Sequence, residues 1–112
     1  MFSIDSTDNT IKLTRGDTAR FSIDITNDIS ESDYTFSKDD ILNFTVKKRV
    51  KDEESLIKKT SVGTTLFHIK PEDTNSMTFG KYVYDVQLTT VDGDVYTIIG
   101  PSTFELLTEV TY

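Results

Sequence analysis

Few side chains of this protein could take part in catalysis, and none lies in a recognised catalytic arrangement. His68 is the single histidine among 112 residues, and it sits between two apolar residues of a predicted strand. A histidine activates a serine only where a third group orients it, and the sequence has no Gly-x-Ser-x-Gly turn to expose such a serine. We therefore interpret His68 as a half-exposed strand residue, and we expect no catalytic site and no enzyme activity.

The sequence also contains no recognised motif for binding a metal ion or a cofactor. The sequence has no cysteine, which excludes disulfides, thiolate chemistry and zinc sites of the cysteine type. Neighbouring carboxylates that could bind calcium occur at three places: Asp39-Asp40, Glu53-Glu54 and Asp92 with Asp94. Their spacing does not match a known calcium loop, and aspartate is common in turns for its own hydrogen bonds. The sequence also lacks a glycine-rich phosphate loop, so we expect no metal ion and no cofactor.

The charge balance argues against a nucleic-acid partner. There are 19 Asp and Glu against 12 Lys and Arg, a formal net charge of -7, whereas binding to a phosphate backbone requires basic side chains. The basic residues do gather in one stretch: Lys47, Lys48, Arg49, Lys51, Lys58 and Lys59. Three acidic residues, at 52–54, interrupt this stretch, so we interpret it as a solvated charged hairpin.

A membrane partner is not expected either. No run approaches the roughly 18 apolar residues that span a bilayer. The first residues also lack the basic and apolar segments of a secretory signal peptide.

The pattern of apolar residues predicts strands almost throughout. The clearest run is Gly80 to Thr90, and other strands are expected at residues 10–14, 19–26, 41–48, 56–59, 64–70, 94–99 and 102–111, with a short edge strand at Tyr34 and Phe36. The inward-facing residues are expected to be Phe21, Ile23, Ile25, Leu42, Phe44, Val46, Tyr82, Tyr84, Val86, Leu88, Phe104, Leu106 and Val110. Pro71-Glu-Asp-Thr74 predicts one helical turn, because proline and acidic groups favour a helix start.

Together these elements predict an all-β protein, an antiparallel immunoglobulin-like β-sandwich of about 7–8 short strands with one short helical turn. The length allows one domain, which we place at residues 10–112. Residues 1–9 are polar apart from Phe2 and Ile4, and we expect them to form a flexible or docking arm.

The predicted hairpin at Asp92-Gly93 has two alternative registers. A two-residue loop pairs Thr90 with Val95, whereas a three-residue loop ending in Gly93 pairs Thr89 with Val95. A slip of one residue exchanges every side chain between core and solvent. We favour the second register because it buries the larger side chains, Tyr96 and Ile98.

Two short motifs carry further meaning. Gly80-Lys-Tyr82, after the predicted helical turn, resembles the tyrosine corner of immunoglobulin-like sandwiches, whose hydroxyl bonds to the backbone a few residues upstream. The chain has no tryptophan, so the resemblance is to that architecture and not to antibodies. Arg15-Gly16-Asp17 matches the cell-adhesion tripeptide, but glycine and aspartate are also ordinary turn residues, and we interpret it as a turn.

Several segments, taken in order, resemble a phage family. They are Ile11-Lys-Leu-Thr-Arg-Gly-Asp-Thr18, Asp40-Ile-Leu-Asn-Phe-Thr-Val-Lys47, Ile69-Lys-Pro-Glu-Asp-Thr74, Tyr82-Val-Tyr-Asp-Val-Gln-Leu88, Asp92-Gly-Asp-Val95 and Phe104-Glu-Leu-Leu-Thr-Glu-Val-Thr111. The chain is similar to the amino-terminal domain of tailed-phage upper baseplate proteins and related prophage tail proteins of low-GC Gram-positive bacteria. The resemblance covers nearly the whole chain after residue 10.

This resemblance implies a non-enzymatic structural or interaction module of a phage or prophage particle. Such a module is assembled in the bacterial cytoplasm, resides in the virion and binds other phage particle proteins. Self-association through edge strands or residues 1–9 is also expected, because unpaired sheet edges attract other chains. The alternative is a small carbohydrate- or protein-binding accessory domain of a bacterial surface system, which an exposed aromatic platform would favour.

Overall fold

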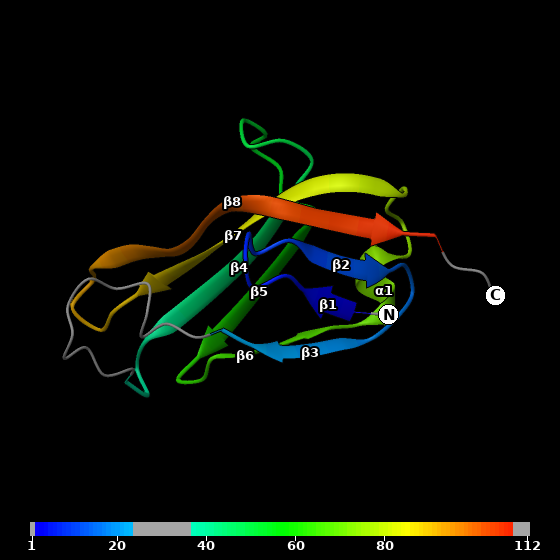
Figure 1. Cartoon of the computed structure of the whole chain (residues 1–112). Coiled ribbons are helices and arrows are strands. Elements are labelled where there is room, and N and C mark those ends of the chain that lie inside the picture. Colours follow the sequence, from blue (N-terminus) through cyan, green and yellow to red (C-terminus); the bar gives the residue numbers. More distant parts are fainter. Residues whose placement is uncertain (1, 24–36, 109–112) are drawn as a thin grey trace.

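A computed structural model describes residues 2–23 and 37–108, and their regular structure is β apart from one helical turn (Figure 1). The elements are β1 (Phe2–Ile4), β2 (Ile11–Thr14), β3 (Ala19–Ser22), β4 (Ile41–Lys47), β5 (Ile57–Val62), β6 (Leu66–Ile69), α1 (Pro71–Thr74), β7 (Gly80–Thr89) and β8 (Val95–Leu107). The predictions of an all-β protein and of a helical turn at Pro71–Thr74 are confirmed.

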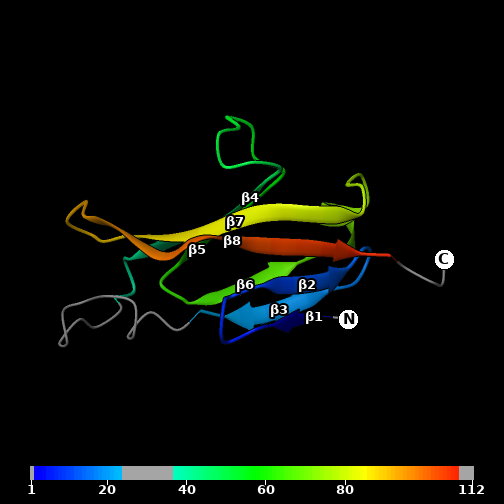
Figure 2. The same ribbon diagram turned by 45° about the horizontal axis from the view of Figure 1, so that its top comes forward.

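The strands form two sheets. Six lie in the order β1-β2-β8-β7-β4-β5, and β3 pairs with β6 in a second sheet that lies across one face of the first (Figure 2). The described pairings are antiparallel except that of β2 with β8, which are parallel over Ile11–Thr14 and Phe104–Leu107. The prediction of an entirely antiparallel arrangement is therefore wrong. After β2 the chain crosses to β3 in the second sheet, and it returns to β2 only with its last strand, β8. A long connection of this kind allows the two strands to run in parallel.

Other predicted boundaries also change. Phe2–Ile4, expected in the arm, form β1 and pair with β2, because the Phe2 ring stacks on Phe21 with centroids 5.1 Å apart.

The strand expected at 56–59 extends to Val62. The two strands expected at 94–99 and 102–111 join as β8, whose register against β7 shifts near Gly100-Pro101, as at a β-bulge. The predicted residues Ile25, Tyr34, Phe36 and Val110, and the ends of the strands expected at 19–26 and 102–111, lie outside the described residues.

The favoured hairpin register is confirmed. Thr89 pairs with Val95, and Leu88 pairs with Tyr96. The Gly93 amide donates to the Thr90 carbonyl at 2.9 Å, which closes the turn. Ile98 is buried in consequence and Tyr96 packs partly against the core.

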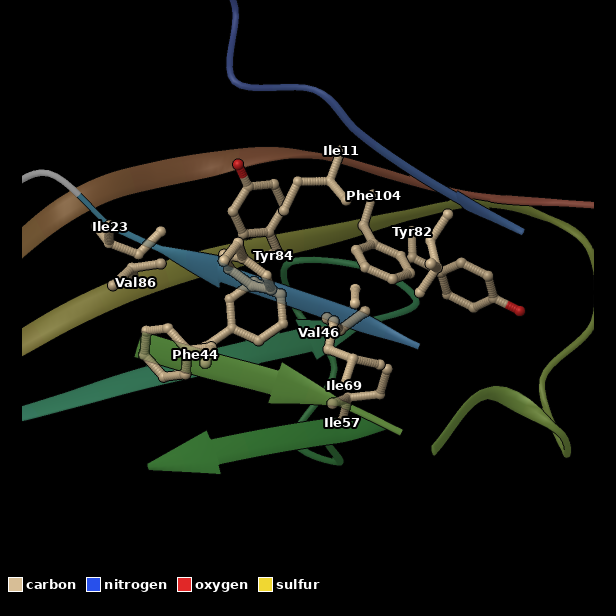
Figure 3. Close-up of a cluster of buried hydrophobic side chains, with 14 of the residues drawn as sticks. Ile11, Ile23, Phe44, Val46, Ile57, Ile69, Tyr82, Tyr84, Val86 and Phe104 are labelled. Carbon is tan, nitrogen blue, oxygen red and sulfur yellow. The ribbon is translucent and has the colours of Figure 1, made fainter. Parts of the chain in front are cut away.

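The centre of the core is the fully buried ring of Phe44 on β4 (Figure 3). Its centroid lies 5.3 Å from that of Tyr84 on β7, 5.6 Å from Phe21 on β3, 5.7 Å from Phe67 on β6 and 6.5 Å from Phe104 on β8. Rings at such separations gain energy beyond the burial of their area. Phe44 therefore contacts rings from four other strands, two in its own sheet and two in the small sheet.

Two tyrosine hydroxyls clamp connections to β7. Tyr82 donates to the carbonyl oxygen of Thr78 at 2.6 Å, which confirms the hydrogen bond expected of a tyrosine corner. Tyr84 donates to the carbonyl of Asn9, in the connection between β1 and β2. Burial, with a smaller effect of the Asp8 charge, raises the pKa of Tyr84 to about 12. Tyr84 is thus a protonated donor at neutral pH.

Asp40 ties three connections together at the opposite end of the sheets. Its carboxylate accepts hydrogen bonds from the amides of Ser37 and Val91 at 2.9 and 3.3 Å. Its carbonyl accepts from the amide of Gly63 at 2.8 Å. The residue is only 2% exposed, so replacing its carboxylate would remove two partly buried hydrogen bonds.

The hydroxyl of Tyr82 can be tested by removal. Tyr82→Phe should lower the free energy of unfolding by about 1 kcal/mol, because the Thr78 carbonyl loses its donor while the ring remains. Tyr96→Phe is the matched control, because the Tyr96 hydroxyl has no hydrogen-bond partner in the part of the chain that the structure describes. Equal denaturation midpoints for Tyr82→Phe and the control would show that the corner contributes no stability.

Two turn glycines allow a second comparison. Gly63 and Gly93 have φ values of 72° and 90°, so alanine at either should cost of order 1–3 kcal/mol in strain. An added Cβ at Gly63 would also lie 2.5 Å from the Lys38 carbonyl oxygen, whereas that at Gly93 meets nothing within 4 Å. We expect thermal unfolding to rank Gly63→Ala clearly below Gly93→Ala. The reverse ranking would contradict the close approach at Gly63.

Candidate interaction surfaces

His68 lies on β6 and is half-buried, as predicted. It stands opposite Arg20 of β3 in the strand register. Partial burial and the nearby charges of Arg20 and Lys70 lower its pKa. His68 thus has the half-exposed strand position expected from the sequence, opposite a cation.

Of the carboxylates considered as calcium ligands, Asp40 has defined hydrogen-bond partners. Among the described residues, no group of three or more histidine and acidic side chains is placed to hold a metal ion. Asp40 is a buried hydrogen-bond acceptor, whereas the neighbouring Asp39 is exposed. Asp52 accepts from the amide of Arg49 at 3.1 Å, which shapes the β4–β5 hairpin.

The Arg15-Gly16-Asp17 tripeptide is held against the molecule. The Arg15 guanidinium lies 4.4 Å from the centre of the Phe79 ring and donates to the Met77 carbonyl at 3.4 Å. The Gly16 amide donates to the Thr74 hydroxyl of α1 at 3.0 Å. The tripeptide is therefore part of the turn between β2 and β3, as interpreted from the sequence, and this turn packs against α1.

The outer face of the large sheet, opposite the small sheet, contains an area without charge. One row of paired, outward-facing residues crosses four strands: Val62, Ile41, Thr89 and Val95. The next row is Thr60, Asn43, Gln87 and Thr97. We call these eight residues the uncharged face. Val62 and Val95 are 61% and 58% exposed, so apolar groups at both sides of this face contact solvent.

Charge returns in the adjacent row, where Lys58 pairs with Thr45, and Thr45 pairs with Asp85. Burial raises the pKa of Asp85, and the neighbouring Lys47 partly offsets the shift. The β4–β5 hairpin rises beside this row (Figure 1). Its Val50 lines a small cavity together with Lys47 and Asp85.

A groove lies on the outer face of the small sheet. It is lined by Arg20, Phe21 and Ser22 of β3 and by Leu66, Phe67 and His68 of β6. We call it the β3–β6 groove. Leu66 is 62% exposed, and Arg20 is exposed beside it. The groove thus combines apolar surface with positive charge on a protein whose net charge is -7.

The two edges of the large sheet differ. β1 is only three residues long, and short edges discourage further pairing. β5 is longer and carries Lys58 and Lys59. Lys59 forms an ion pair with Asp73 of α1 at 2.7 Å. Although partial burial opposes it, this contact and the Lys70 amide lower the pKa of Asp73.

Comparisons with protein families, curated proteins and solved structures give no match to this chain. No helix in the described part of the chain is long and apolar enough to cross a bilayer.

Sequence reasoning did not find the uncharged face or the β3–β6 groove. The alternation did place Asn43 and Gln87 on outward positions, which was the available signal. However, residues from four strands form one surface only when their lateral register is known, and local patterns do not contain that register.

The raised pKa of Asp85 predicts that replacing this residue increases the free energy of unfolding by an amount that depends on pH. Burial makes ionisation of Asp85 more costly in the folded state than in the unfolded state, so Asp85→Asn should increase the free energy of unfolding at pH 7. The gain should shrink as the pH falls through the raised pKa, where the wild-type group takes up its proton. Denaturant unfolding at several pH values measures this, with Asp92→Asn at an exposed turn as the control. A variant less stable than wild type at pH 7 would contradict the assignment.

Proposed function

We propose that this protein is a non-enzymatic structural or interaction module of a phage or prophage particle, attached to the baseplate or tail. The observation that carries the proposal is the uncharged face. More than a quarter of the chain is charged (28%), yet eight neighbouring positions across four strands carry no charge. The centres of protein interfaces are depleted of charged residues in the same way.

The proposed architecture is an immunoglobulin-like sandwich with one parallel strand pair. The pairing of β3 with β6 against a sheet containing β8, β7, β4 and β5 supports it, because two facing sheets of this order occur in that fold. The Tyr82 hydrogen bond after a helical turn supports it further. In this proposal, the contacting rings of Phe44 and Tyr84 take the role that a tryptophan and a disulfide have in the core of antibody domains.

The sequence segments resemble, in their order along the chain, those of upper baseplate proteins, and this resemblance supports the assignment to a phage particle. Other phage particle proteins are the proposed partners, and the virion, assembled in the bacterial cytoplasm, is the proposed location. Self-association through an edge strand or residues 1–9 remains part of the proposal. For residues 2–4, that contact would involve the exposed side of β1, since Phe2 already packs on Phe21.

The alternative, a carbohydrate- or protein-binding accessory domain, has less support. Sugar-binding sandwiches present flat aromatic surfaces, because rings stack on sugar faces. Among the described residues, the one large exposed aromatic side chain is Phe79, 43% exposed, and Arg15 covers its ring. The described surface therefore has no aromatic platform.

The uncharged face can be tested by adding charge to it. Gln87 and Thr97 are both exposed, so the double variant Gln87→Lys, Thr97→Lys should fold normally. We expect it to be lost from purified phage particles, because buried unpaired charges oppose docking. Ser76→Lys, at an exposed position away from the face, is the control and should be retained.

Mass spectrometry of particles from the phage or prophage that encodes the chain provides the measurement. Circular dichroism melting of each variant establishes that it folds. Retention of the folded double variant at the level of the control would exclude the uncharged face as the docking surface. Absence of the wild-type chain from particles would reject the phage function itself.

A further inference from the structure

We propose that copies of this protein associate head to tail, with the β7–β8 hairpin tip of one copy bound in the β3–β6 groove of the next. The hairpin tip is residues 90–95. This inference rests on the proposed function as an interaction module, and it specifies one partner as a second copy of the chain.

The groove offers an apolar patch beside positive charge. Leu66 is 62% exposed and is the apolar side chain on the outer side of the groove, since the rings of Phe21 and Phe67 pack into the core. Arg20 is exposed on the same face, and Lys70 follows the end of β6. An exposed leucine flanked by cations suits a partner that combines apolar and acidic side chains.

The hairpin tip has this combination. Val91 and Val95 are 64% and 58% exposed, and the carboxylates Asp92 and Asp94 are exposed between them. Figure 1 shows the hairpin extending from one end of the large sheet. Among the described connections, the hairpin tip is the one in which two exposed valines stand on either side of two acidic residues.

The tip is also held in one conformation before it binds. The Thr90 amide donates to the Asp94 carbonyl at 2.8 Å, and the Asp94 amide donates to the Thr90 hydroxyl at 3.1 Å. The Val91 amide donates to the carboxylate of the buried Asp40 at 3.3 Å. A segment ordered in advance loses little conformational entropy on binding, which favours association.

The two surfaces are complementary in charge and in apolar character, and they lie on different parts of one chain. Contact between them is therefore heterologous, which produces rings if the rotation closes and open chains if it does not. Net repulsion between copies of charge -7 is screened beyond about 8 Å at physiological salt. The short-range contact between Asp94 and Arg20 keeps its attraction under those conditions.

A charge exchange tests the contact directly. Arg20→Glu reverses the groove and Asp94→Arg reverses the tip, so each variant alone should associate at least about tenfold more weakly than wild type. In an equimolar mixture, each tip meets a groove of opposite charge, so association should return. Glu53→Arg, on the β4–β5 hairpin, makes the same charge change as Asp94→Arg and should leave association unchanged.

Sedimentation velocity of the full chain over a range of concentrations measures association, and thermal melting confirms that each variant is folded. Wild-type protein that stays monomeric at every concentration would overturn the proposal. A mixture that fails to associate, or a Glu53→Arg variant weakened as much as Asp94→Arg, would overturn it as well. Incorporation into particles without self-association would leave the proposed function standing and remove only this contact.

Discussion

The fold depends on the ring of Phe44. This side chain contacts aromatic residues from both sheets, so it holds in place strands that share no backbone hydrogen bonds. Truncating a buried phenylalanine to alanine typically costs about 3–5 kcal/mol, a large part of the stability of a domain this size. The chain has no disulfide to compensate. The packing of these rings therefore holds the two sheets together without a covalent link.

The same packing determines which surfaces are available for binding. Because Phe44 and its neighbours fill the space between the sheets, the alternate residues of β4 must point outward, and the first three of these, Ile41, Asn43 and Thr45, are uncharged. On the other side, Phe21 and Phe67 turn inward and leave Arg20 and Leu66 outside. One core thus produces two outer faces of different character, one uncharged and one basic.

Local features of the fold were predictable from sequence, and long-range pairings were not. Alternation identified the buried faces of β4 and β7, and the size of Tyr96 and Ile98 identified the hairpin register. Proline and acidic residues marked α1. By contrast, nothing near Ile11 indicates that it will pair in parallel with Phe104, and Phe2 finds Phe21 only in the folded chain. The outer surfaces escaped prediction for this reason, since each is assembled across strands from separate parts of the chain.

The parallel pair of β2 and β8 has a consequence for the order of folding. Residues 11–14 hydrogen-bond to residues 104–107, so the two partners are separated by almost the entire sequence. Contacts between such distant residues carry a large loop-closure entropy and are associated with slow folding. During synthesis, β2 emerges from the ribosome long before its partner exists. Until then the apolar residues Ile11 and Leu13 of β2 lack the cover that β8 gives them, so this segment exposes apolar surface that can aggregate on the nascent chain.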